Sequence, residues 1–130
     1  MLLALAGCGK APLCSSKIVK VSRDPASDLI ATTELRNCGA TTDYATIVRV
    51  GRAGDPTDEM TEVFVADSDH GAAAAGDGGT VWTSVVWTAP RRLSIAYASH
   101  AQLFRHIGAA GNASITYRAD EPSLPVPLVP

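Results

Sequence analysis

Apolar and polar residues alternate in several short segments of the chain, which is the pattern of a half-buried β-strand. Successive side chains of a strand point to opposite sides, so every second residue shares a face. Residues 28–37 are typical, because one face carries Leu29, Ala31, Thr33 and Leu35. The segments that predict strands are 16–23, 28–37, 43–52, 63–67, 80–88, 91–99 and 112–119.

Turn-forming residues separate these segments. Residues 24–27 read Asp-Pro-Ala-Ser and predict a hairpin turn, because proline fixes one dihedral angle and Asp and Ser bond to nearby backbone. Residues 53–62 and 68–79 are polar or rich in glycine and predict surface loops. Residues 100–110 favour no single element. We therefore expect an all-β domain, either a small antiparallel sandwich or a partly open barrel of about seven strands.

The length of 130 residues suits one domain with its own core, which we expect over residues 16–119. Residues 120–130 contain too many prolines for a strand ladder and predict an extended tail. The formal net charge of −2 and the pI near 5.8 lack the cationic surplus that binds phosphate backbones. We therefore expect no nucleic-acid partner.

The N-terminal sequence MLLALAGCGK contains Leu5-Ala6-Gly7-Cys8, which resembles the lipobox of bacterial lipoproteins. The resemblance implies cleavage before Cys8, lipidation of that residue, and sorting to the periplasmic face of the outer membrane, because Gly9 replaces the Asp of inner-membrane retention. Residues 1–15 would then be a truncated signal and tether. Seven residues precede Cys8 and none is charged, so we expect the precursor to start further upstream.

A lipid anchor would attach the domain to the membrane without spanning it, since no later segment approaches ~20 apolar residues. If Cys8 carries lipid, Cys14 and Cys38 remain as an even pair in an oxidising compartment, which favours a disulfide bond. A free structural thiol and a catalytic or metal-binding thiol are the alternatives. A reactive thiol would need a neighbouring base, and no such signature surrounds Cys38.

A second resemblance covers roughly residues 16–118. The stretches CGATT (38–42) and VFVADSDHG (63–71), followed by a strand with tryptophan and by RRLSIAY, are similar to a group of small uncharacterised bacterial proteins, often lipoproteins or phage-associated. The resemblance implies a shared fold and no particular activity.

The chemically suggestive residues of the chain are Asp67, Asp69 and His70. Their oxygens could bind a hard cation, but the stretch lacks the later ligands of a calcium loop, and the three histidines lack zinc-ligand spacing. We favour a solvated turn with a local Asx-type hydrogen bond. Serines 68 and 99, near His70 and His100, lie in no nucleophile elbow. We expect no catalytic residue, no metal and no cofactor.

Trp82 and Trp87 have opposite strand parity, which predicts that one faces the core and the other faces outward. An outward tryptophan is a candidate contact residue, and packing beneath the Pro-rich tail is the alternative. We therefore include Trp82 with Asp67, Asp69 and His70 in a possible ligand or partner loop.

These observations predict a membrane-tethered, non-catalytic envelope protein that binds an unknown envelope protein through its loops and a strand edge. An inhibitor, an immunity protein and an assembly factor all fit. The alternative is an envelope hydrolase or metal-binding protein that uses Asp67, Asp69 and His70.

Overall fold

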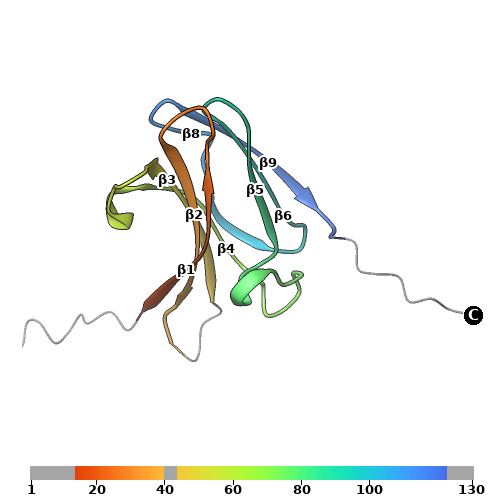
Figure 1. Ribbon diagram of the computed structural model, residues 1–130. Coiled ribbons are helices and arrows are strands. Elements are labelled where there is room, and N and C mark those ends of the chain that lie inside the picture. The colour runs from red at the N-terminus through yellow and green to blue at the C-terminus, as the bar shows by residue number, and fades with distance from the viewer. Residues whose placement is uncertain (1–13, 40–43, 123–130) are drawn as a thin grey trace, which may run out of the picture.

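The computed structural model describes residues 14–39 and 44–122 as two packed β-sheets (Figure 1). One sheet has five strands in the order β1-β2-β3-β4-β7, and the other has four in the order β5-β6-β9-β8. Neither sheet closes into a barrel, so the predicted all-β sandwich is confirmed. The strands are β1 (Ser15–Arg23), β2 (Leu29–Asn37), β3 (Ala45–Arg52), β4 (Thr61–Asp67), β5 (Thr83–Ala89), β6 (Arg92–Ala98), β7 (Gln102–His106), β8 (Ala109–Ala110) and β9 (Ala113–Asp120).

Two short 3₁₀ turns complete the elements of the described residues, η1 (Thr57–Glu59) and η2 (Asp77–Gly79). The strand count exceeds the expected seven because residues 100–110, which favoured no element, supply β7 and β8. All strand pairs are antiparallel except β6 and β9, which run parallel. The chain leaves the four-stranded sheet after β6, adds β7 to the other sheet and then returns, and a parallel pair requires such a crossover.

The facing sides of the two sheets enclose the main core. Phe64 from β4 and Leu93 and Ile95 from β6 are almost completely buried there. Full burial of a side chain of this size stabilises the fold by about 1.5–3 kcal/mol. The predicted alternation is confirmed at the start of β2, where Leu29 and Ala31 face this core.

Tyr117 on β9 joins the two sheets through its hydroxyl group. Its Oη lies 2.7 Å from the carbonyl oxygens of both Val63 and Ile107, so the two acceptors share one proton. Burial raises the pKa of the phenol above its usual value. The ring also contacts Phe64 and His106, with centroid distances of 6.1 Å and 5.7 Å.

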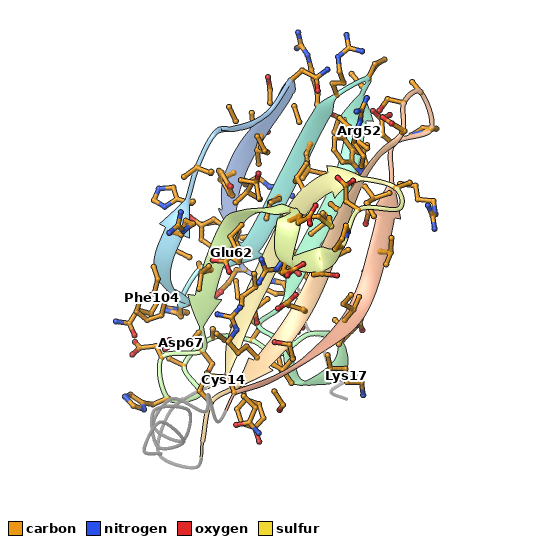
Figure 2. All side chains as sticks on the ribbon, turned by 90° about the vertical axis from the view of Figure 1, so that its left-hand side faces the viewer. Cys14, Lys17, Arg52, Glu62, Asp67 and Phe104 are labelled. Carbon is orange, nitrogen blue, oxygen red and sulfur yellow. A yellow bond between two sulfur atoms is a disulfide. The ribbon has the colours of Figure 1, made fainter. Side chains whose placement is uncertain are left out.

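A disulfide bond joins Cys14 and Cys38, as the sequence predicts. Ser15 and Asn37 are register partners, so the bond closes the open end of the β1–β2 hairpin. Figure 2 shows Cys14 at this end of the molecule. The Gly-Ala-Thr-Thr connection after Cys38 lies mostly outside the described residues. Cys14 and Cys38 are therefore joined in a structural disulfide bond.

The outer face of the five-stranded sheet carries an ion-pair network that sequence analysis did not predict. Glu34 on β2 keeps only 3% of its side chain exposed, and its Oε1 lies 3.2 Å from Nε of Arg49 on β3. Arg49 Nη2 lies 3.0 Å from Oε2 of Glu62 on β4, and Arg36 Nη2 lies 3.4 Å from the same oxygen. The network thus connects three adjacent strands across the sheet.

Candidate functional site

A cleft of about 530 Å³ opens at the end of the sandwich opposite Cys14. It lies among the β1–β2 turn, the β3–β4 loop and the β5–β6 and β8–β9 turns. In Figure 2, Arg52 marks this end at the top and Cys14 lies at the bottom. We call it the end cleft. Its charged lining residues are Asp28, Arg52, Asp55, Glu59 and Arg91.

The topology explains why these connections meet. In successive antiparallel strands, every second connection returns to the same end of the sheet. The β1–β2 turn and the β3–β4 loop therefore share one end, and the β2–β3 connection lies at the other. The end cleft thus follows from strand order, and its lining residues come from distant parts of the sequence.

The carboxylate of Asp24 fixes two of these turns to each other. Asp24 is only 4% exposed, and its Oδ2 accepts hydrogen bonds from Ser27 Oγ at 2.6 Å and from the Arg91 backbone N–H at 2.9 Å. Its Oδ1 accepts a bond from the Ala26 backbone N–H at 3.0 Å. These bonds, with that from Ser27 contributing most, hold the pKa of Asp24 below its usual value.

Arg91 occupies the left-handed region, with φ of 60°, which is costly for a residue with a Cβ. The bond from its N–H to Asp24 helps to hold this conformation, which sets the direction in which the Arg91 side chain leaves the turn. Its guanidinium group makes no ion pair with any residue in the described ranges. The turn therefore presents a cation at the cleft, and the charge of Arg91 also helps to lower the pKa of Asp24.

The β3–β4 loop is tied to the β1–β2 turn on the other side of the cleft. Arg52 Nε lies 3.1 Å from Asp28 Oδ2, and the Ala53 N–H donates to the Asp28 carbonyl at 2.7 Å. The Arg52 backbone N–H also donates to Asp55 Oδ2 at 3.0 Å. Glu59, on η1, forms no ion pair within the described part of the chain. The cleft therefore offers unpaired charges of both signs on loops already held in place.

The loop that carries Asp67, Asp69 and His70 lies away from the end cleft. The Asp69 N–H donates to Asp67 Oδ1 at 2.9 Å, which is the local hydrogen bond that the sequence predicts. Asp69 and His70 both have left-handed backbones. The described residues contain no group of three His, Cys, Asp or Glu side chains that could hold a metal ion. Figure 2 places Asp67 near the opposite end from Arg52.

The side chains of Ser99 and His100 both contact the carboxylate of Glu121, beside a second cleft of about 380 Å³. Ser99 Oγ donates to Glu121 Oε1 at 2.9 Å, and His100 Nε2 lies 3.4 Å from Glu121 Oε2. A serine nucleophile needs the imidazole as its own proton acceptor, with the carboxylate behind the histidine. Here the carboxylate lies between the two, so this geometry does not activate the serine.

The two tryptophans do not follow the predicted parity, because Trp82 lies just before β5 and not within it. Trp87 packs against the main core, and its Nε1 donates to the Ser22 carbonyl at 3.0 Å. Trp82 is half-buried against a smaller cluster of Ala73, Val81 and Ala98. Both rings therefore take part in packing. Most of the Pro-rich tail that was considered as a cover lies outside the described residues.

No family model, curated protein or solved structure matches this chain. Within residues 14–39 and 44–122, no helix has the length and apolar character needed to cross a bilayer. Cys8, the predicted lipidation site, lies outside the described residues. The two resemblances stated from sequence remain predictions.

The possible ligand or partner loop predicted from the sequence comprises Asp67, Asp69, His70 and Trp82, none of which lines the end cleft. One feature of the sequence does point to this cleft, because residues 53–62 predict a surface loop that carries Asp55, Asp58, Glu59 and Glu62. The alternation of hairpin ends would have brought this loop beside the turn at 24–27. The role of Arg91 had no comparable signal, since it depends on the backbone contact with Asp24.

Proposed function

We propose that this protein is a non-catalytic binding module of the bacterial envelope, tethered to a membrane through lipid on Cys8, which holds a protein partner in the end cleft. The observation that carries the proposal is a charged cleft with hydrogen-bonded loops at the end of the sandwich opposite Cys14. The roles that fit are those of an inhibitor, an immunity protein or an assembly factor.

The positions of tether and cleft suit this role. Six residue steps separate Cys8 from Cys14, a reach of at most ~20 Å. The nine residues of β1 then extend the domain by about 30 Å from Cys14 towards the end cleft. A module anchored in this way would present the cleft away from the membrane surface, where a second protein can reach it.

The charges of the cleft favour a protein partner. Arg91 and Glu59 have opposite charges and form no ion pair with any described residue, so a partner needs an acidic and a basic group at matching positions. Complementary charges of this kind set orientation and selectivity more than total affinity. Because Asp24, Asp28 and Asp55 already hold the loops, binding would require little additional ordering.

Capture from envelope extract tests the proposal. The bait is the full chain with Cys8→Ser, compared with the same chain carrying Arg91→Glu and with a control carrying Arg105→Glu, an exposed cation on β7. We expect one protein to be retained by the parent and the control, and to be lost with Arg91→Glu. Equal retention by all three baits would exclude the end cleft as the binding site.

The tether is tested separately. With a complete signal sequence placed upstream, the parent should partition into detergent and carry acyl chains, as measured by intact mass. Cys8→Ser should remain in the aqueous phase or remain unprocessed. Equal partition of the two forms would disprove the lipid anchor and leave the cleft proposal standing.

A further inference from the structure

Strand β1 carries unpaired positive charge along a free sheet edge. Among the described strands it pairs with β2 alone, and it contains Lys17, Lys20 and Arg23 with no acidic residue. None of these three cations contacts a carboxylate of the described residues. Other cations of the sandwich do form such pairs, namely Arg36, Arg49, Arg52 and Arg118. In a chain with a net charge of −2, this edge is a local excess of positive charge.

Two apolar side chains stand among these cations. Ile18 is 44% exposed and Val21 is 45% exposed, and both belong to the same strand. Their register partners are Glu34 and Thr32, on the outer face of the sheet. A strand that added to β1 beside Ile18 would cover this apolar side chain while its own backbone paired with the edge.

Only part of β1 is open to such pairing. Near its end, Ser22 Oγ donates to the Val85 carbonyl at 3.1 Å, and the Ser22 carbonyl accepts from Trp87 Nε1 at 3.0 Å. Strand β5 therefore covers this end of the β1 edge. The part that β5 does not cover is residues 15–20, which includes both lysines (Figure 2 labels Lys17). The register with β2 shifts between Ile18 and Lys20, and the Val19 side chain lies beside Gly78 of η2.

Lysines on an edge strand discourage pairing with neutral or basic strands. They also oppose pairing of β1 with β1 of a second copy, because like charges would face each other across the ladder. The same lysines favour an acidic strand, whose carboxylates would neutralise them. The edge therefore selects its occupant by charge.

We propose that residues 15–20 of β1 bind an extended acidic segment of a partner protein as an added strand. Backbone hydrogen bonds would supply affinity, and ion pairs to Lys17 and Lys20 would supply selectivity. The inference rests on the proposed role as a binding module, but it concerns a surface separate from the end cleft.

The test uses the full chain with Cys8→Ser and a blocked peptide of about eight alternating Glu and Val residues. Amide chemical shifts should change along residues 15–20 and in the neighbouring part of β2. Affinity should fall about tenfold as salt rises from about 50 to about 500 mM, because exposed ion pairs are screened. The matching Lys-Val peptide should not bind. Shift changes confined to the end cleft would overturn the proposal.

Protein variants give the matched comparison. Lys17→Glu with Lys20→Glu should weaken peptide binding at least about tenfold, whereas Arg92→Glu with Arg105→Glu, which changes net charge equally, should leave binding nearly unchanged. Equal weakening in both pairs would indicate a nonspecific charge effect and overturn the proposal. A peptide N-methylated at alternate residues should not bind, because it lacks the backbone N–H groups that pair with β1. Undiminished binding of this peptide would also contradict the proposal.

Other occupants are outcomes of the same work. Self-association of the parent in sedimentation, abolished by the lysine changes, would assign the edge to a second copy and contradict the inference. Lysine-dependent binding to phosphatidylglycerol vesicles without peptide binding would assign it to a membrane, with the same consequence. Neither result would alter Arg91-dependent capture, so the proposed function would be judged independently.

Discussion

Single residues determine whether the loops of the end cleft keep their positions, and Asp24 is the principal example. One buried carboxylate bonds to Ala26, to Ser27 and to the backbone of Arg91, and so joins two turns from opposite sheets. A carboxylate that accepts several hydrogen bonds in the folded state stabilises the fold more when it is ionised than when it is protonated.

The pH dependence of stability should therefore reveal Asp24. Its pKa is depressed in the folded protein, so its stabilisation is present above the unfolded value of about 3.9 and is lost as the pH falls through the folded value. In thermal melts between about pH 2 and 7, Asp24→Asn should melt lower than the parent near neutrality, and the difference should shrink in acid. Asp58→Asn, on exposed η1, is the control. A difference independent of pH would contradict this role.

At the scale of the element, the alternation along each strand predicted which face is buried. It did not predict features that depend on contacts between strands. The face of β2 that carries Leu29 and Ala31 was correct, because period-2 burial is a local property. Glu34 was missed, because an outward glutamate resembles a solvated strand position until register places Arg49 beside it. The parallel pairing of β6 and β9 depends on a crossover, which no single segment encodes.

Arg49 should be the most sensitive position of the outer-face network. Arg49→Ala leaves Glu34 buried without its nearest cation, and losing one partner of a buried pair costs about 3–5 kcal/mol, or somewhat less here because Arg36 Nη2 still lies 3.8 Å from Glu34 Oε2. Arg52→Ala breaks the exposed pair with Asp28 and should cost about 0–1 kcal/mol. Urea unfolding measures both. Similar losses for the two variants would show that the network is not effectively buried.

The disulfide should be a structural link of the β1–β2 hairpin. Cys14→Ala with Cys38→Ala should lower the free energy of unfolding by about 2–4 kcal/mol and the melting temperature by roughly 10 °C, because the unfolded chain gains freedom. Partner binding should survive at low temperature. Alkylation of the native, non-reduced protein should add no label at either cysteine, and labelling of Cys38 would disprove the link.

At the scale of the molecule, the sandwich separates a disulfide-closed end from a charged loop end, with a cationic strand edge between them. The sequence predicted the sandwich and the disulfide, because both depend on pattern and cysteine number. It did not predict the end cleft, because Arg91 and Glu59 line the same cleft only after strand order brings their loops to one end. We propose that a protein partner occupies this charged end.

Site-specific photo-cross-linking in living cells tests that claim most directly. A photoreactive amino acid is placed at Asn112, which lines the end cleft, or at Ser68, in the loop at the opposite end. The account predicts a covalent adduct with one envelope protein from position 112, lost when Arg91→Glu is added, and no adduct from position 68. An adduct from position 68 alone would contradict it.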